Sequence, residues 1–551
     1  MMRPPDPHQP ALDAFLNAAL REGRLRDARF GAGRLAFSDA AGRRVEVALR
    51  AASRFRCLFA APILRTDGDR AATLDALTLL GDLAAEHGAA FRARVLDSAR
   101  AIAAAPPARG RAGDWTFAQA EQALKAGHCH HPNPRSRDEM TEADARLYAP
   151  EQEGRFALTW FEADAGATLT NPGAAHLLDA LALADLGRRS APGRQLLPWH
   201  PWQADRLLAR PDIAALASAG RLSVAGPGRA AWTATSSMRA VHAWHAPVMV
   251  KSALSLRLTN STRHLSLREV ARGVQVSALL AGPVGAAIAA AFPRLSILGE
   301  PGYAALTDGA APIDAAIVAL RDNPFRDPAR PGPAVLAALC EARPDGPSAL
   351  GATIARLGGD AEETAIRWFD RFLDIAILPL LEIRARWGLL FGSHQQNMML
   401  SLEGGWPDRA WIRDCQGTGH LADFHDRLSA LSPGIGEGTE NVVPADLGDG
   451  LLTYYVVVAN AFNVVATLTL DGLAREDRLL SAWRRALIRA RSATPGDRTL
   501  YDRLLDAPVL TAKGNFATSV SGVNEASGGA GGQLAAFLDL PNPLAHLKEP
   551  A

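Results

Sequence analysis

The spacing of apolar residues changes along the chain, and this change constrains the fold more than any other feature. Residues 10–105 are rich in Ala and Leu at helical spacing, and Pro106 and Pro107 end that pattern. Residues 166–340 begin with helical spacing and then turn to strand-like alternation, whereas the chain from about residue 360 is largely helical again. The sequence therefore predicts an α+β protein.

At 551 residues the chain is too long to bury its apolar side chains in a single core. Boundaries placed where the pattern changes give three domains, at 1–165, 166–358 and 359–551. Within the middle domain, residues 299–335 are rich in Gly, Pro and Asp and are predicted to form loops. In the last domain, the long apolar helix after residue 360 is expected to kink at Pro379.

Composition excludes several classes of protein. Lys and Arg number 59 and Asp and Glu 58, a net charge of +1, so nucleic acid is not an expected partner. The four cysteines are scattered without CxxC spacing, which fits a reduced protein better than a disulfide framework or a zinc site. The N-terminal residues have no apolar signal core, and no stretch approaches the roughly 20 uninterrupted apolar residues of a membrane helix. We therefore expect a cytoplasmic protein with no membrane partner.

Two polar segments, GSHQQN (392–397) and RDCQGTG (413–419), adjoin two short strand candidates that are joined by the turn-forming residues EGGWPD. In an antiparallel hairpin the first residue of one strand lies beside the last residue of the other. Asn397 and Asp414 should therefore meet at the open end, with His394 just before them. An amide oxygen beside a carboxylate suits Mg²⁺, and protein kinases hold the metals that bridge ATP phosphates in this way.

A structural interpretation of the same residues is equally open. His394 and Asn397 would then cap a turn, and Asp414 would form an ion pair with Arg413.

The run VMVKSALSLRLT (248–259) is predicted to be one strand with two different faces. Its even-numbered positions are mostly apolar, whereas Lys251, Ser255, Arg257 and Thr259 share the other face with Met249. Arg263 follows in a turn that could bring it to the same place. Such a face suits an anionic ligand, because Arg matches the geometry of carboxylate and phosphate. An ordinary solvated sheet face is the alternative for this strand alone.

Two further polar segments are candidates for binding phosphate. TATSSMRAV supplies the hydroxyls of Ser236 and Ser237 and the guanidinium of Arg239. GHCHHPNPRSR (127–137) places three histidines, including His131, close to Arg135, and its ligand spacing does not suit tetrahedral zinc. A third segment, LPWHPWQADRL (197–207), reads as a turn into a helix with structural aromatic residues.

These segments resemble, in their order along the chain, the motifs of the NRPS-independent siderophore synthetases of the IucA/IucC (aerobactin synthetase-like) family. The matching segments are GHCHHPNPRSR, LPWHPWQ, TSSMRAV, the spacing from Lys251 to TNSTR, SHQQN, RDCQG and, near the C-terminus, PNPL. Each motif alone is weak, but their order and spacing together are specific.

The resemblance implies a cupped-hand architecture of thumb, fingers and palm, with an antiparallel sheet in the fingers (166–358) and a largely helical palm (359–551). It also implies an enzyme that uses ATP to adenylate a carboxylate, often that of citrate, and then condenses it with an amine or alcohol, releasing AMP and pyrophosphate. ATP and Mg²⁺ are the implied cofactors, and a homodimer is the implied assembly.

The resemblance also implies roles for single residues. Around ATP it places Ser236, Ser237, Arg239, Lys251, His394, Asn397 and Asp414, with His131 and Arg135 on the thumb side. The metal would be held by Asn397 and Asp414, and the carboxylate substrate by Thr259, Arg263, His394 and Arg257. Catalysis would depend on Arg263, His394 and Lys251, with His394 donating hydrogen bonds rather than acting as a base.

The chain departs from the family pattern at four positions. Ala240 stands where Thr is common, Gly392 where an acidic residue is common, Arg135 where Lys is usual and Glu139 where Gly is usual. These departures are consistent with two outcomes: an enzyme with a different substrate, or an enzyme with weakened activity.

Two other functions remain alternatives at this stage. The Asn/Asp hairpin also suits a phosphotransferase, although no Gly-rich phosphate loop precedes the Lys251 strand. A non-catalytic protein that binds ATP or a ferric chelate would account for the departures at 240 and 392.

Overall fold

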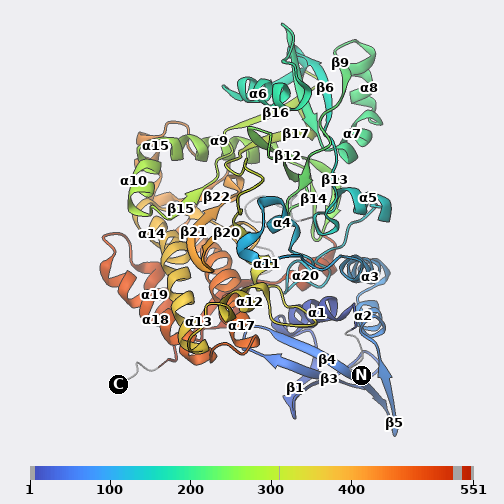
Figure 1. Cartoon of the computed structure of the whole chain (residues 1–551), viewed down its shortest axis with the longest axis vertical. Helices are drawn as coiled ribbons and strands as arrows, with labels where there is room; N and C mark the ends of the chain where they lie inside the picture. The colour runs from blue at the N-terminus through green and yellow to red at the C-terminus, as the bar shows by residue number, and fades with distance from the viewer. Residues whose placement is uncertain (1–5, 310, 525–536, 548–551) are drawn as a thin grey trace.

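The computed structural model describes residues 6–309, 311–524 and 537–547, and it shows an elongated molecule with mixed α and β structure (Figure 1). An N-terminal region lies at one end and the middle of the chain at the other, with the C-terminal helices along one side. The α+β prediction is confirmed.

The N-terminal region is a five-stranded antiparallel sheet whose apolar side packs on helices. The strands are β1 (Arg26–Gly31), β2 (Arg34–Ser38), β3 (Arg44–Ala52), β4 (Cys57–Asp67) and β5 (Arg70–Leu74); the helices are α1 (Gln9–Arg21), α2 (Ala76–Ala85) and α3 (Ala89–Ala103). The helical prediction for 10–105 is thus wrong for 26–74. Alternate residues in this stretch, such as Leu35 and Phe37, are buried, which is the strand period rather than the helical one.

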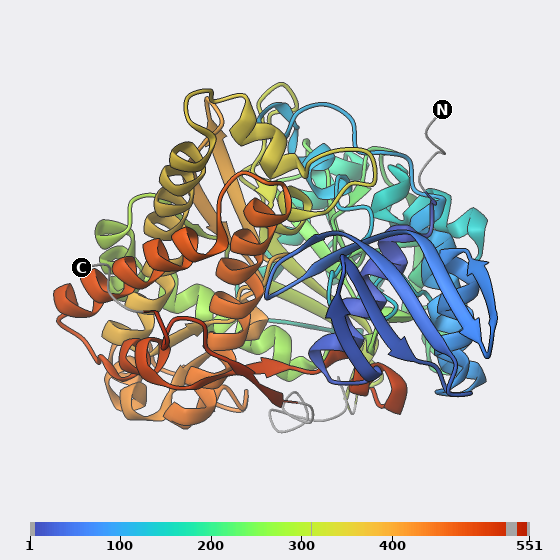
Figure 2. The same ribbon diagram turned by 90° about the horizontal axis from the view of Figure 1, so that it is seen from below.

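A connecting segment, with α4 (Phe117–Gln122) and α5 (Glu142–Tyr148), leads from this region to the middle of the chain. Figure 2 shows, from below, the N-terminal sheet standing beside the C-terminal helices.

The middle of the chain holds two larger sheets and their covering helices. The three-stranded sheet is β8 (Arg194–Trp199), β6 (Thr159–Asp164) and β9 (Leu222–Pro227); the six-stranded sheet, in spatial order, is β10 (Thr233–Ala234), β11 (Ala240–His242), β12 (Val248–Ser252), β17 (Pro312–Asp322), β16 (Gly302–Thr307) and β7 (Thr168–Thr170). The helices are α6 (Ala174–Leu186), α7 (Pro201–Leu208), α8 (Pro211–Ser218), α9 (Leu267–Ala281) and α10 (Pro283–Ala291).

Two predictions for the middle of the chain are wrong. Residues 299–335 are not mainly loops, since they contain β16 and β17, and β17 is a central strand. The run 248–259 is not one strand either. It divides at Ala253 into β12 of the six-stranded sheet and β13 (Leu254–Leu258), which forms a separate two-stranded sheet with β14 (Ser261–Arg263).

The C-terminal part combines small sheets with many helices. A four-stranded sheet has the order β15 (Leu295–Ile297), β21 (Trp406–Ile412), β20 (Met398–Glu403) and β18 (Ala334–Val335); a three-stranded sheet joins β19 (Leu389–Phe391), β22 (Thr418–Leu421) and β23 (Val442–Val443); β24 (Val509–Lys513) pairs with β25 (Phe537–Pro541). The helices are α11 (Leu336–Cys340), α12 (Ala349–Ala355), α13 (Ala361–Phe372), α14 (Leu378–Trp387), α15 (His425–Leu431), α16 (Ala445–Leu452), α17 (Phe462–Leu470), α18 (Glu476–Ala493), α19 (Thr499–Asp506) and α20 (Asn515–Ser521).

Two π-helical segments interrupt the core helices. One, η4 (Leu373–Ile377), lies just before Pro379, where the proline has no N–H to continue the helical hydrogen bonds. The other, η7 (Thr453–Ala461), joins α16 to α17. The continuous helical segment Ala445–Leu470 is long and apolar enough to span a bilayer, but 83% of its most apolar window is buried inside the protein, as in a core helix.

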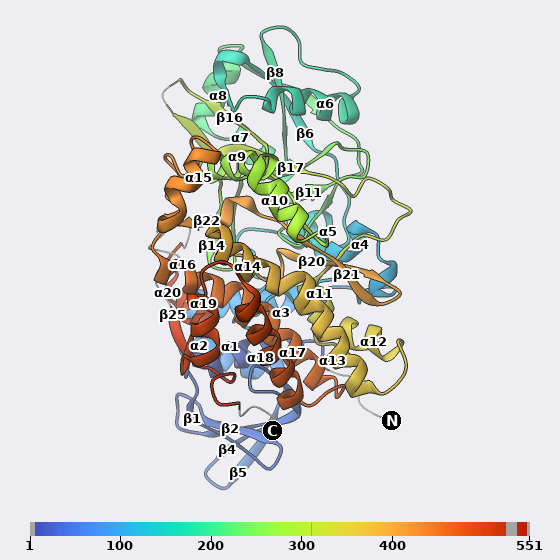
Figure 3. The same ribbon diagram turned by 90° about the vertical axis from the view of Figure 1, so that its left-hand side faces the viewer.

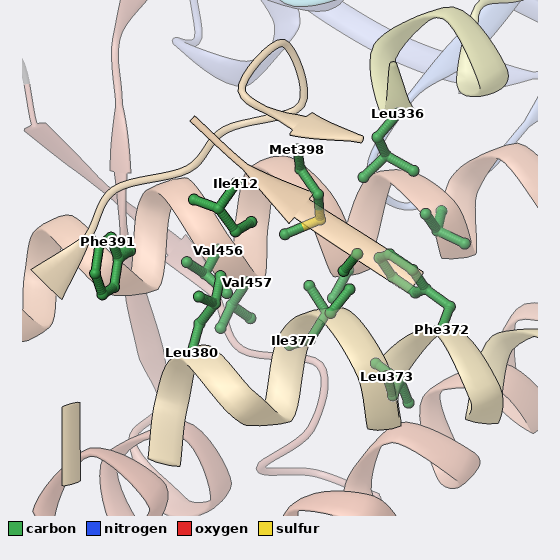
Figure 4. Close-up of a cluster of buried hydrophobic side chains, with 14 of the residues drawn as sticks. Leu336, Phe372, Leu373, Ile377, Leu380, Phe391, Met398, Ile412, Val456 and Val457 are labelled. Atoms are coloured by element: carbon green, nitrogen blue, oxygen red, sulfur yellow. The ribbon is translucent and has the colours of Figure 1, made fainter. Parts of the chain in front are cut away.

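The β20–β21 hairpin packs on these core helices. Figure 4 shows Met398 and Ile412 of the hairpin in one cluster of buried side chains with Ile377, Val456 and Val457. Because Met398 and Ile412 are paired across the strands, they present one apolar face to the helices beside the open end of the hairpin.

The largest core does not follow the predicted domain boundaries. It joins Trp115 and Phe117 from 1–165 and Leu336 from 166–358 to the helices of 359–551. Figure 3 shows α10, α11, α13 and α14 along one side of the molecule, although they come from two predicted domains. The division at 165/166 and 358/359 stays a prediction.

Candidate active site

The three regions meet around a cavity of about 710 Å³. Its walls come from the histidine-containing loop 127–137, the segment between β10 and β11, the β13–β14 turn, the open end of the β20–β21 hairpin, and α16 with η7. The predicted site residues that line it are His131, Arg135, Ser236, Ser237, Arg239, Lys251, Thr259, Arg263, His394, Asn397 and Asp414. The structure thus brings together groups separated by up to about 280 residues.

The hairpin places Asn397 and Asp414 as the sequence predicts. Met398 pairs with Ile412, the Arg413 N–H donates to the Asn397 carbonyl, and the Asn397 amide nitrogen lies 3.2 Å from Asp414 Oδ2. Asp414 itself adopts a left-handed backbone conformation with φ of 77°. Such a conformation is strained for a non-glycine residue, and it turns the carboxylate into the cavity.

Lys251 joins this pair from the opposite sheet. Its ammonium group donates to Asp414 Oδ1 at 2.6 Å and to Gln416 Oε1 at 2.7 Å. Lys251 is almost completely buried, and its charge is balanced by Asp414 and by Glu300 at 3.5 Å. The face predicted to meet an anion is therefore not a solvated surface.

Glu300 and Arg321 belong to the same network, although no motif in the sequence indicated them. Arg321 donates to Glu300 Oε1 at 2.6 Å and lies 3.9 Å from Asp414. In β17 it stands opposite Met249, so it shares the face of Lys251. The apolar run of β17, which ends in Arg–Asp, could have indicated a strand with a charged end. Because Gly- and Pro-rich residues surround it, the segment was predicted to be a loop.

The two cations decide the charge of Asp414. Burial alone raises the pKa of this carboxyl, but Lys251 and Arg321 outweigh burial and hold the pKa well below its usual range. Asp414 is therefore an anion at pH 7.

The proposed structural pairing of Asp414 with Arg413 is wrong. Arg413 is buried and instead forms an ion pair with Glu121 of α4, and it donates to Ser236 Oγ at 3.0 Å. Gln396 Nε2 donates to the Ser236 carbonyl at 2.7 Å. These contacts fix the hairpin end against the segment that follows β10.

That segment presents its own polar groups to the cavity. The Ser237 hydroxyl lies 3.1 Å from Thr235 Oγ1, and Arg239 donates to the His264 carbonyl at 3.0 Å. Ala240 stands opposite Lys251 in the β11–β12 pairing, where its methyl group adds no hydrogen-bonding atom.

The β13–β14 turn orients Thr259 and Arg263. Arg263 donates to Thr259 Oγ1 at 3.1 Å and to the Leu258 carbonyl at 3.2 Å, and Thr259 has a φ of 56°. Both residues line the cavity. Arg257 does not, since its guanidinium donates to the Gly522 carbonyl at 2.9 Å, so the structure does not bring Arg257 to the predicted substrate site.

His394 is neutral at pH 7, because burial lowers its pKa to about 4. Its Nδ1 accepts the N–H of Gln396 at 3.3 Å, which places the ring proton on Nε2. His394 can therefore donate one hydrogen bond from Nε2.

On the other side of the cavity, Arg135 and His131 are largely buried. Burial lowers the pKa of Arg135 to about 10, and its side chain donates to the carbonyls of Leu124 and Lys125 and lies 3.5 Å from Glu151. Much of its hydrogen-bonding capacity is thus used within the protein. The histidine loop itself is held by α20, since Asn515 donates to the His130 carbonyl at 3.0 Å.

The cavity also has residues that no motif indicated, among them Arg268, Arg272, Tyr455 and Lys513. Among the described residues no cluster of three or more His, Cys, Asp or Glu could hold a metal ion, so a metal here would need ligands from a substrate as well.

A solved structure shares this fold. The fold matches that of ATP-bound aerobactin synthetase IucA from a hypervirulent pathotype of Klebsiella pneumoniae, with a TM-score of 0.89 and 27% identity, over 97% of this chain and 99% of that one.

The sequence comparisons lead to the same group of proteins. The rhizobactin siderophore biosynthesis protein RhbC of Rhizobium meliloti is 34% identical over 88% of each chain. The N(2)-citryl-N(6)-acetyl-N(6)-hydroxylysine synthase of Vibrio mimicus is 32% identical over 79% of this chain and 75% of that one. The IucA / IucC family model matches residues 116–341, and a model described as ferric iron reductase FhuF-like transporter matches 366–528. This chain belongs to the IucA/IucC family.

Proposed function

We propose that this protein uses ATP to activate a carboxylate of citrate, or of a related polycarboxylate, and joins it to an amine or alcohol. A carboxylate oxygen attacks the α-phosphorus, the bond to the β-phosphate breaks and pyrophosphate leaves. The acceptor nitrogen or oxygen then attacks the acyl carbon, the acyl–phosphate bond breaks with its electrons going to AMP, and the acceptor's proton passes to solvent. The names of the relatives, which include a citryl-hydroxylysine synthase, support this choice.

The observation that carries the proposal is that Lys251, Arg239 and Arg263 line one cavity with the Asn397–Asp414 pair, and that Lys251 donates to Asp414. Adenylation brings two anions together, so its transition state requires positive charge already in place. These cations supply that charge without reorganisation, since Lys251 and Arg263 are both held by hydrogen bonds.

Two residues of the cavity, Asn397 and Asp414, have side chains suited to binding Mg²⁺. Asp414 Oδ2 and, with its amide turned, the Asn397 oxygen would be two ligands side by side, and phosphate oxygens would complete the coordination. When bound, the ion supplies charge neutralisation of the phosphates.

In this proposal Ser236, Ser237 and Arg239 bind phosphate oxygens, whereas Thr259 and Arg263 bind the carboxylate substrate. His394 donates from Nε2 to the reacting anion. The cupped-hand division into thumb, fingers and palm, a homodimer and a cytoplasmic location belong to the same proposal.

Carboxylate-dependent release of pyrophosphate from ATP, with trapping of the acyl-adenylate by hydroxylamine as a hydroxamate, tests the proposal. We expect release with citrate or a related acid. Arg263→Ala should lower kcat/KM for the carboxylate at least about 100-fold, because it removes a fixed charge at the reacting group. Arg188→Ala, at a 45% exposed arginine that pairs with Glu162, is the matched control and should leave activity unchanged.

No pyrophosphate release across a broad panel of acids would refute the proposal. ADP as the product would favour a phosphotransferase, and ATP binding without turnover would favour a non-catalytic protein.

A further inference from the structure

Two walls of the cavity are held by one carboxylate that lies outside it. Glu121 of α4 is almost completely buried and does not line the cavity. Its Oε2 accepts the backbone N–H of Ser236 at 2.8 Å, and both of its oxygens accept hydrogen bonds from the Arg413 guanidinium. Glu121 therefore holds the segment after β10 and the end of the β20–β21 hairpin at the same time.

Arg413 and Gln396 complete the connection between these two walls. The Arg413 guanidinium also donates to Ser236 Oγ at 3.0 Å and to the Gln396 carbonyl. Gln396 Nε2 in turn donates to the Ser236 carbonyl at 2.7 Å. We define the Glu121 clamp as Glu121, Ser236, Gln396 and Arg413. Its hydrogen bonds form one closed network.

The clamp is next in sequence to the groups assigned to the phosphates and the metal. Each clamp residue other than Glu121 comes directly before a cavity residue of that kind, in the pairs Ser236–Ser237, Gln396–Asn397 and Arg413–Asp414. Adjacent Cα atoms are about 3.8 Å apart across a rigid peptide unit, so fixing one residue of a pair restricts the other. The clamp thus sets the separation between Ser237 and the Asn397–Asp414 pair.

The helix α4, which carries Glu121, is itself fixed near the middle of the molecule (Figure 1). Phe117 belongs to the largest core, where its ring stacks on Phe325 at 4.3 Å and meets His242 of β11 edge-on at 4.7 Å. Just after α4, the Leu124 carbonyl accepts a hydrogen bond from Arg135 of the histidine-containing loop. A third wall of the cavity is therefore tied to the same short stretch of chain.

Stability alone is a weak reason for this arrangement. A buried ion pair is often no more stabilising than a pair of apolar side chains of similar volume. Adenylation, however, needs the ATP phosphates to be held by Ser237 and by the Asn397–Asp414 pair at the same time. A displacement of about 1 Å between such groups can lower a rate about 100-fold.

We propose that Glu121 is a positioning residue for adenylation. It touches no substrate, and it acts by holding Ser237 and the Asn397–Asp414 pair at the separation that the transition state requires. Each wall can still contact ATP without the clamp, so Glu121 affects kcat more than the KM for ATP. This inference rests on the proposed function and adds a residue that acts through others.

Glu121→Gln in the full-length protein tests this inference. The variant keeps one oxygen for the Ser236 N–H but places an amide donor against the Arg413 guanidinium. We expect kcat for carboxylate-dependent pyrophosphate release to fall about 10- to 100-fold, with the KM for ATP changed less than about threefold, because the loss is confined to the transition state.

Asp449→Asn is the matched control. Asp449 accepts hydrogen bonds from Arg384 at 2.7 and 2.9 Å, and this pair is as deeply buried as Glu121 and Arg413. Asp449 does not line the cavity. Both variants remove a carboxylate charge beside a buried arginine, so both should lower the Tm. Only Glu121→Gln should lower kcat.

The double variant Glu121→Met, Arg413→Met separates positioning from stability. It leaves neither charge buried without a partner, so its Tm should return towards that of the unmodified protein. Its kcat should remain at least about 10-fold low, because neither side chain then joins the two walls.

The outcomes separate this inference from the proposed function. Absence of carboxylate-dependent pyrophosphate release in the unmodified protein contradicts the function itself. With normal release in that protein, an unchanged kcat in Glu121→Gln overturns the inference, and so does a change in the KM for ATP alone. A kcat that recovers with the Tm in the double variant, or an equal loss of kcat in Asp449→Asn, would show a purely structural role and also overturns it.

Discussion

Glu300 should be essential for stability, because it balances two buried cations, Lys251 and Arg321. Glu300→Ala leaves Arg321 buried without its 2.6 Å partner, so we expect the free energy of unfolding to fall by about 3–5 kcal/mol. Urea denaturation followed by circular dichroism measures this change.

The double variant Glu300→Met, Arg321→Met is the control for that experiment. It removes both charges and should recover most of the loss. A loss below about 1 kcal/mol for Glu300→Ala alone would contradict the role assigned to Glu300.

Asp414 and Lys251 show how far single site residues can be predicted from the sequence. The pairing rule of an antiparallel hairpin placed Asn397 beside Asp414 correctly, because two short strands and a turn determine that geometry locally. The partner of Asp414 was not predictable in the same way, because Lys251 reaches it from another sheet across 163 residues. Glu300 and Arg321 were missed for the same reason.

At the scale of helices and strands, the errors have two physical causes. Alanine-rich segments such as 26–74 fit both the helical period of 3.6 residues and the strand period of two. The strands form because α1 and α2 cover one face of the sheet and bury alternate residues, a contact that the local sequence does not show. In the run 248–259 polar and apolar residues continue to alternate across Ala253, although the two halves join different sheets. A chain can leave one sheet for another without any change in this alternation, so the break could not be predicted. Helices with caps, such as α9 with its Ser266–Glu269 capping box, were predictable.

The N-terminus of α7 (Pro201–Leu208) should make stability depend on pH. His200 caps this helix, is fully buried against Tyr148 and Phe156, and burial lowers its pKa to about 3. The unfolded chain therefore takes up the proton first, so stability is complete above about pH 6.5 and decreases as the pH falls towards 3. This histidine alone should cost about 2 kcal/mol between pH 7 and pH 5.

Denaturation curves at several pH values test this expectation with His200→Asn, which keeps a side chain able to cap the helix. The variant should lose about 2 kcal/mol less than the unmodified protein between pH 7 and pH 5. An unchanged pH dependence would mean that His200 does not take up a proton on unfolding.

At the scale of the whole molecule, the cores are built from segments that are distant in the sequence. Arg56 of the N-terminal region donates to the Thr467 hydroxyl at 3.1 Å, and the Phe55 and Phe462 rings stack at 4.5 Å. Such contacts leave no periodic pattern of apolar residues in the sequence. Domain boundaries predicted from changes in that pattern therefore do not coincide with the limits of the hydrophobic cores.

The C-terminal part should therefore not fold by itself. A fragment of residues 359–551 lacks Trp115, Phe117 and Leu336, all of which lie in its core, so large apolar surfaces would be left in water. We expect the fragment to show no cooperative thermal unfolding, whereas the full-length chain should unfold cooperatively. Differential scanning calorimetry measures both transitions. Because the cavity takes its walls from all three regions, the fragment should also fail to bind ATP. A fragment with its own sharp transition would show instead that the boundary at 358/359 separates two independently folding units.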